Sequence, residues 1–337
     1  MKKYLSLFFI LLSMACGKKN QITELKMPSV IHLTGEKVET ILPRCYETGV
    51  LVDSFLVLKE NCTDTLFYLF SAISGQEVFR FGDKGRGVCE FYYPLFLSNS
   101  FAYDSLIIYD IPVGRLTKID LHALVENQDI TKCANSEHLY RNLNFMYNLN
   151  KIDSAFIGTF IEKDEGLFSF CNRNNGEIKN TDYVPYYFYE KGRKDAYCHH
   201  VLVSEKDNSI IVPFKYMNLI NCYDLDGNLK VTYALDWIKE EINTQIRVDE
   251  HTTVTFYRTY ATRNRCYLVW DGHKIEEELR KYPAKIVVMN WQGELEKVYQ
   301  LDNFADFIIP DEKQRMIYVG VYNAGLEFVE IYKYPML

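Results

Sequence analysis

A short pattern recurs six times along this chain, at intervals of 49 to 56 residues. Each copy is a polar doublet followed directly by an apolar run, as in Asp104-Ser105 before Leu106-Ile107-Ile108. Self-similarity at a period near 50 residues is typical of arrays that repeat one supersecondary unit. The six doublets are Asp53-Ser54, Asp104-Ser105, Asp153-Ser154, Asn208-Ser209, Asn264-Arg265 and Gln314-Arg315. We therefore expect six copies of one unit.

Each unit has the pattern of four strands. After the doublet and its strand, a hairpin turns through Gly, as at Asn175-Gly176 and Asp226-Gly227, where both residues tolerate positive φ. Before the doublet lies a continuous apolar run such as residues 201–203, which is typical of a strand covered on both faces. The pattern predicts an all-β, six-bladed β-propeller with four antiparallel strands per blade.

A propeller of this kind must join its first and last blades. A strand from one terminus can complete the sheet made by the other, and residues 37–42 contain Val38, Thr40 and Ile41 in a strand-like pattern. We expect this segment to pair with the last blade, around residues 316–334. The ring would then be closed by an N-terminal strand.

The N-terminus has the pattern of a lipoprotein signal. Lys2 and Lys3 precede a short apolar run over residues 5–12, and Ala15 is a small residue at the expected cleavage site. A positive region, a short apolar region and a small residue at the cut indicate a secretory signal rather than a membrane span. Cys16 directly follows, so we expect it to be the lipid attachment site. An ordinary signal cut near Ala15 is the alternative.

The domain boundaries follow from this signal and from the repeats. We expect residues 1–15 to be the signal peptide, 16–35 a lipid-anchored tether and 36–337 the propeller. No acidic residue follows Cys16 closely, which favours the bacterial outer membrane, with the propeller facing the periplasm or the cell exterior. No later apolar run approaches the roughly 20 residues that a spanning helix needs.

Composition excludes some partners and leaves the cysteines unassigned. With 45 acidic against 38 basic residues and no basic block after residue 20, the chain is not suited to nucleic acid, which is bound by clustered Lys and Arg. Eight cysteines remain beside Cys16, without a Cys-x-x-Cys pair, so zinc is not indicated and 105 disulfide pairings stay open. Most of these cysteines are expected to be small buried side chains.

Three local motifs have the residue types of a site. Residues 82–87, with Lys84 and Arg86, could cradle an anion, but no helix pattern follows, which favours a turn between blades. The triplet Cys198-His199-His200 has metal-ligand residue types, although adjacent His side chains on a strand point to opposite faces. The carboxylates at residues 224–226 resemble part of a calcium loop and are better explained by the hairpin. We therefore predict no metal.

Two charged stretches, residues 236–247 and 271–282, are expected to form short helices in loops. Their simplest role is a solvated surface, but insertions on one rim of a propeller are also where partners bind. The candidate contacts in them, added to Lys84 and Arg86, are Lys239, Glu240, Glu241, Glu276, Glu277 and Glu278.

Residues 81–91, with the sequence FGDKGRGVCEF, resemble a signature of TolB-like six-bladed propeller lipoproteins. In that family an Arg/Lys-Gly-x-Gly-Pro-Gly-Glu-Phe loop follows the first blade. Residues 104–110, 290–293 and 318–322 also look like that family, and the similarity covers most of residues 40–337. The match departs at Val88 and Cys89, where Pro and Gly are usual.

The resemblance implies a propeller fold and lipid anchoring, and it brings no catalytic residue or cofactor. We therefore expect a membrane-anchored lipoprotein outside the cytoplasm, a non-enzymatic binding or scaffolding module for a protein or glycan partner. The alternative is a metal-dependent propeller hydrolase or lactonase.

Overall fold

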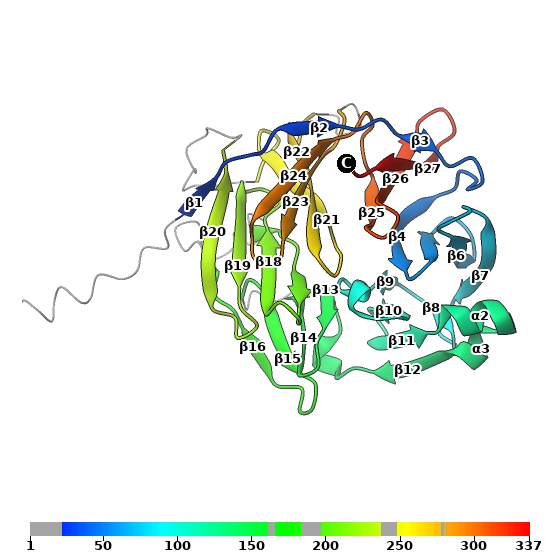
Figure 1. Cartoon of the computed structure of the whole chain (residues 1–337). Coiled ribbons are helices and arrows are strands. Elements are labelled where there is room, and N and C mark those ends of the chain that lie inside the picture. Colours follow the sequence, from blue (N-terminus) through cyan, green and yellow to red (C-terminus); the bar gives the residue numbers. More distant parts are fainter. Residues whose placement is uncertain (1–21, 161–165, 184–196, 237–247, 278–279, 281) are drawn as a thin grey trace, which may run out of the picture.

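The computed structural model describes residues 22–160, 166–183, 197–236, 248–277, 280 and 282–337. Six β-sheets are arranged around a central axis, each formed mainly by one sequence repeat (Figure 1). The predicted six-bladed, all-β propeller is confirmed. Within the described residues, no helix is both long and apolar enough to cross a bilayer.

The first three blades follow the chain from its first repeat. Their strands are β4 (Tyr46–Val52), β5 (Phe55–Glu60), β6 (Thr65–Ser71), β7 (Glu77–Lys84) and β8 (Glu90–Phe91) in blade 1; β9 (Pro94–Phe96), β10 (Leu106–Asp110), β11 (Arg115–Ile119) and β12 (Ala134–His138) in blade 2; and β13 (Met146–Lys151), β14 (Ala155–Phe160), β15 (Ser169–Asn172) and β16 (Ile178–Asn180) in blade 3.

The other three blades include segments from the N-terminus. Their repeat strands are β17 (Leu202–Ser204), β18 (Ser209–Pro213), β19 (Leu219–Tyr223) and β20 (Leu229–Leu235) in blade 4; β21 (Thr253–Ala261), β22 (Arg265–Lys274), β23 (Lys285–Asn290) and β24 (Leu295–Gln300) in blade 5; and β25 (Phe307–Asp311), β26 (Met316–Asn323) and β27 (Phe328–Pro335) in blade 6. The N-terminal strands are β1 (Ile22–Leu25), β2 (Val30–His32) and β3 (Glu36–Lys37).

Burial follows the position of each strand in its blade. All residues of β10 and β18 are buried, because neighbouring blades cover both faces of these strands. Outer strands such as β16, whose Lys179 and Asn180 are both exposed, are covered far less. At the Asp226-Gly227 hairpin only the Gly adopts positive φ, at 84°, and the pairing of β19 with β20 shifts by a bulge. This turn therefore needs one residue with positive φ, rather than the two that a type I′ turn requires.

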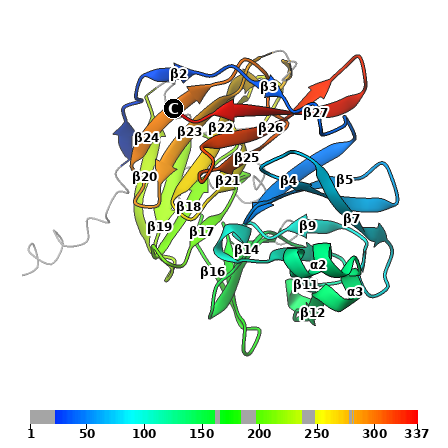
Figure 2. The same ribbon diagram turned by 45° about the vertical axis from the view of Figure 1, so that its right-hand side comes forward.

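Short helices occur where the repeats are interrupted. α2 (Leu121–Asn127) and α3 (Ile130–Cys133) connect β11 to β12 and lie beside these strands (Figure 2). Two single turns of 3-10 helix, η1 (Ser100–Ala102) and η2 (Arg141–Leu143), are also present. A short helix was expected within residues 271–282. That prediction is wrong for residues 271–274, which continue strand β22. Residues 237–247 lie outside the described part of the chain.

The predicted closure by an N-terminal strand is confirmed, but the strand is not residues 37–42: of that segment only Lys37 lies in β3, and a turn follows in which the Ile41 N–H donates to the Val38 carbonyl. β3 pairs antiparallel with β27, and the Val38 N–H donates to the Ile331 carbonyl at 2.8 Å. Upstream, β1 adds in parallel to β20 and β2 adds in parallel to β24. We call residues 22–37 the N-terminal strap. It follows the outer edges of blades 4, 5 and 6 (Figure 1), so these residues of the expected tether form part of the sheets.

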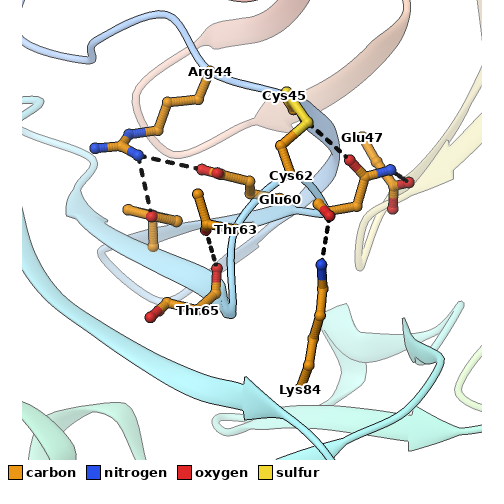
Figure 3. Close-up of a disulfide and its surroundings, with 10 residues drawn as sticks. Arg44, Cys45, Glu47, Glu60, Cys62, Thr63, Thr65 and Lys84 are labelled. Carbon is orange, nitrogen blue, oxygen red and sulfur yellow. Dashed lines mark hydrogen bonds and ion pairs between the residues drawn. A yellow bond between two sulfur atoms is a disulfide. The ribbon is translucent and has the colours of Figure 1, made fainter.

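A disulfide joins Cys45, just before β4, to Cys62 in the turn between β5 and β6 (Figure 3). The pairing of β4 with β5 places Tyr46 opposite Glu60 and so brings the two cysteines together. Beside them, Lys84 donates to the Asn61 carbonyl at 2.7 Å. The disulfide therefore fixes the start of the inner strand of blade 1 to the turn that follows the neighbouring strand, β5.

Replacing both Cys45 and Cys62 with Ser should lower the free energy of unfolding by about 3 kcal/mol. The cross-link closes a loop with a sequence separation of 17, and releasing it raises the entropy of the unfolded chain. Urea unfolding of both proteins measures the difference. Reductant should destabilise the natural chain and leave the double variant unchanged; an equal response of the two proteins would contradict the assignment.

Candidate functional site

The central channel has two chemically different mouths. Neighbouring strands are antiparallel, so the six polar doublets lie at one end of the channel, which we call the doublet face. The connections between blades return to the inner strands at the other end, which we call the linker face. Tyr260, on β21, packs against three of the apolar clusters between blades, and its hydroxyl accepts from the Leu51 N–H at 3.2 Å.

A cavity of about 500 Å³ opens at the linker face between blades 3, 4 and 5. We call it the tyrosine mouth, because tyrosine is its most frequent lining residue. Two of the tyrosines are buried in its wall and two are partly exposed. It is lined by Tyr147, Asn148, Thr159, Gly166, Leu167, Tyr183, Tyr197, Cys198, His199, His200, Lys215, Tyr257 and Arg258.

Two β-bulges lie where inner strands border the tyrosine mouth. In β13 the register shifts between Tyr147 and Asn150, and Asn148 adopts a φ of 49°. In β21 the register shifts between Phe256 and Arg258. A bulge redirects side chains and is frequent beside binding and active sites. The inner strands of blades 3 and 5 are therefore irregular at the residues that line the cavity.

Aromatic contacts and hydrogen bonds hold the wall of the cavity. The Tyr183 and Tyr197 rings meet edge to face, with centroids 5.0 Å apart. The Tyr257 ring stacks on Phe304 at 5.4 Å, and its hydroxyl donates to the Ala305 carbonyl at 2.6 Å. Such contacts fix the rings before any ligand arrives, which reduces the entropic cost of binding.

The two histidines of the mouth bond to opposite sides. His199 contacts the Tyr197 carbonyl through Nδ1 at 2.5 Å and the Thr159 hydroxyl through Nε2 at 3.2 Å. His200 instead donates through Nε2 to the Tyr257 carbonyl at 3.3 Å. This divergence is what the sequence predicts for adjacent residues. Burial, and secondarily the Arg258 charge, lower the pKa of His200 to about 3, so this imidazole is neutral at physiological pH.

Two cations complete the lining. The Arg258 Nε donates to the Asp306 carbonyl at 3.2 Å, and the Lys215 amino group lies 5.0 Å from the centre of the Tyr216 ring. Among the residues that the structure describes, neither cation has a carboxylate oxygen within 4.0 Å. Within the part of the chain that the structure describes, no Asp or Glu lines the cavity.

The opposite mouth, of about 630 Å³, has its charges paired. His122 Nε2 lies 3.1 Å from an Asp53 carboxylate oxygen, and this contact lowers the pKa of Asp53. Arg263 donates to Asp104 at 2.8 Å, and Thr262 donates to Glu312 at 2.8 Å. The doublet face thus pairs its charges, whereas the two cations of the tyrosine mouth have no carboxylate partner among the residues that the structure describes.

The glycine-rich loop binds the chain's own carboxylate. The Gly87 N–H donates to Glu90 Oε2 at 2.8 Å, and a side chain added at Gly85 would collide with the same carboxylate. Lys84 donates to a backbone carbonyl, and the Arg86 guanidinium lies 5.2 Å from the centre of the Tyr92 ring. The loop is built as a turn between blades, and Lys84 and Arg86 stay predictions as partner contacts at the linker face.

A buried ion pair holds this loop against blade 2. Asp110 accepts from the Tyr92 and Tyr93 N–H groups at 3.0 and 2.8 Å and lies 3.4 Å from Arg115. Arg115 also donates to the Gly87 carbonyl at 2.9 Å. Both side chains are buried, so each depends on the other for charge compensation.

Asp110→Ala should therefore lower the free energy of unfolding by about 3 to 5 kcal/mol, because it leaves the Arg115 charge buried without its partner. Urea unfolding measures the change. Asp104→Ala, which removes an exposed carboxylate paired with Arg263, is the control and should cost no more than about 1 kcal/mol. Equal costs for the two variants would contradict the assigned role.

Of the other predicted contacts, the structure describes Glu276 and Glu277, which lie in a loop of the linker face. Glu276 Oε1 lies 3.0 Å from His251 Nδ1 and so joins its loop to the segment before β21, whereas Glu277 accepts from the Lys274 N–H at 2.9 Å within one turn. Cys16, Lys239, Glu240, Glu241 and Glu278 lie outside the described residues. In the part of the chain that the structure describes, no group of three or more His, Cys, Asp or Glu residues is placed to hold a metal.

No family model matches this sequence, and no curated protein matches it. Among solved structures, one similar protein from Bacteroides fragilis NCTC 9343 is inferred to be exported; it is 10% identical, with a TM-score of 0.56 over 93% of this chain and 99% of its own. A DUF4221 family member from Bacteroides vulgatus ATCC 8482 is 12% identical, with a TM-score of 0.56 over 94% and 98% of the two chains. At these identities the likeness shows the fold alone.

Proposed function

We propose that this chain is an exported, lipid-anchored binding propeller that takes a protein or glycan partner at its tyrosine mouth. The observation that supports this most is the cavity itself, where partly exposed tyrosines meet two cations at two β-bulges, and neither cation has a carboxylate partner within the described residues. Tyr and Arg are enriched at binding hot spots, because Tyr supplies a large contact area with few rotatable bonds and Arg supplies a planar set of hydrogen-bond donors.

Export is supported by the N-terminal signal and by the disulfide. Disulfides form and persist in oxidising compartments outside the cytosol, and Cys45 and Cys62 are joined. Similarity to TolB-like lipoproteins and to an inferred exported propeller agrees with this location. The orientation that we propose is an outer-membrane anchor with the propeller in the periplasm or at the cell surface.

The position of the strap suits an anchor at Cys16. Five residues lie between Cys16 and Ile22, so the two are at most about 20 Å apart when the chain is fully extended. Ile22 pairs with Thr232 at the outer edge of blade 4. A lipid at Cys16 would therefore hold the propeller close to the membrane by its perimeter and leave the tyrosine mouth accessible.

The lining favours binding over metal-dependent hydrolysis. A catalytic metal site in a propeller needs several carboxylates or imidazoles that converge on one point. In the described part of the tyrosine mouth the two imidazoles point to different neighbours, and the charged side chains are cations. This set suits recognition of a ligand with acceptor groups.

The test compares capture and turnover with one soluble protein, starting at Asn20. Immobilised protein should retain a partner from envelope extract, and Tyr147→Ala with Tyr257→Ala should abolish retention; circular dichroism checks that this double variant, which loses the contact of Tyr257 with Phe304, is still folded. Arg263→Ala, at the opposite mouth, is the matched control and should retain the partner. Chelator-sensitive hydrolysis of an ester, lactone or phosphate substrate would instead establish the enzyme alternative.

A further inference from the structure

We infer that the tyrosine mouth selects an acidic saccharide, that is, a sugar with a carboxylate or sulfate beside its ring. This inference rests on the proposed binding function and names the ligand class for the same site. It combines three features of the cavity: unpaired positive charge, exposed aromatic surface and neutral hydrogen-bonding groups.

The charge is the first feature. The whole chain has a formal net charge of −7, yet the two charged lining residues described in the mouth, Lys215 and Arg258, are both cations. Both lie close enough to His200 for their charges to lower its pKa, so they act on the same small volume. Two cations that lie close together repel each other, and an anionic ligand bound between them would offset this repulsion.

The mouth at the doublet face differs, because its cations are paired with carboxylates. There Arg263 is paired with Asp104, and the Lys313 amino group lies 3.9 Å from an Asp53 carboxylate oxygen. An acidic protein has ample carboxylates to neutralise surface cations, and it does so at the doublet face. The two cations of the tyrosine mouth are thus available to a ligand, and Arg258 offers a planar set of donors suited to carboxylate or sulfate.

The aromatic and polar groups indicate a sugar rather than a simple ion. Tyr147 and Tyr257 are partly exposed, so they offer apolar surface to the C–H face of a ring. Asn148 and Thr159 add an amide and a hydroxyl that suit sugar hydroxyl groups, and Asn148 is held by donation to the His199 carbonyl at 3.3 Å. A volume of about 500 Å³ lies within the range of small-ligand sites.

Binding to defined saccharide pairs tests the inference. The soluble protein from Asn20 is titrated calorimetrically with trigalacturonate and its methyl ester, and with a sulfated heparin tetrasaccharide and its desulfated, N-acetylated and carboxyl-reduced form, which carries no charge. We expect at least one acidic member to bind, with its uncharged counterpart about 10-fold weaker or worse. Affinity should fall as salt is raised, because an ionic contact is screened.

Variants assign the binding to the mouth. Lys215→Gln and Arg258→Gln should each weaken the acidic ligand about 10-fold, since each removes a charged hydrogen bond, and should leave the uncharged counterpart unaffected. Arg263→Gln, the control at the doublet face, should change nothing. Circular dichroism melts confirm that each variant is folded.

Equal binding of charged and uncharged members, or no effect of Lys215→Gln and Arg258→Gln, would overturn the inference while the proposed binding function stands. Absence of binding by every acidic saccharide at millimolar concentration would also overturn it. The capture experiment with Tyr147 and Tyr257 variants reports on the proposed function independently, because it does not depend on the charge of the partner.

Discussion

A chain that starts at Val38, without the N-terminal strap, should aggregate rather than give a stable monomer. The strap supplies the outermost strands of three blades, so its removal exposes the edges of β20, β24 and β27, and bare edges pair with other chains. It also removes Leu33, which is 4% exposed in the apolar cluster between blades 5 and 6 and whose burial alone is worth about 1.5 to 3 kcal/mol.

Graded truncation provides the control for this prediction. A chain from Asn20 retains the whole strap and should be monomeric by size-exclusion chromatography with light scattering. A chain from Met27 loses only β1 and should keep ring closure through β3, with a lower melting temperature. If the chain from Val38 is monomeric and has the same melting temperature as the chain from Asn20, the strap does not close the ring.

Cys16→Ser should release the protein from the membrane fraction and abolish its labelling by a clickable palmitate. Two or more acyl chains anchor a protein stably, and the described residues contain no helix that could replace them. Fractionation of cells, followed by in-gel fluorescence, measures both effects. Cys198→Ser, at an exposed thiol of the propeller, is the matched control and should keep the label. Undiminished labelling of Cys16→Ser would show that another residue is acylated.

The sequence predicted the architecture because the fold is repetitive. Six polar doublets followed by apolar runs mark the turns from inner to second strands, and the structure places a strand after each one. The closure near Lys37 was predictable for the same reason, since the last repeat contains only three strands of its own. Repetition also made the blade boundaries visible without any local motif.

The upstream strands of the strap left no such signal. β1 and β2 are four and three residues long, and they add in parallel to edges that are already formed. Such short segments have no measurable period, and their pairing depends on the finished outer surface of blades 4 and 5. The disulfide was equally hidden, because the pairing of Cys45 with Cys62 follows from strand register rather than from spacing.

The candidate site could be predicted only in part. The sequence singles out His199 and His200 as candidate ligands, and strand geometry predicts that their side chains diverge. Tyr147, Lys215 and Tyr257 were missed because they come from three blades and are separated by more than 40 residues along the chain. With 26 tyrosines in the chain, composition singles out none of them. The bulges that border the cavity could not be predicted either, because a bulge is defined by the register of two paired strands.

The most direct test of the binding site is photo-crosslinking in intact cells that produce the lipid-anchored protein. A benzoyl-phenylalanine placed at Tyr147 reports on the tyrosine mouth, and one placed at Phe101 reports on the mouth at the doublet face. We predict an ultraviolet-dependent adduct with a defined partner from position 147 and none from position 101. Adducts from both positions alike, or an adduct from position 101 alone, would contradict binding at the tyrosine mouth.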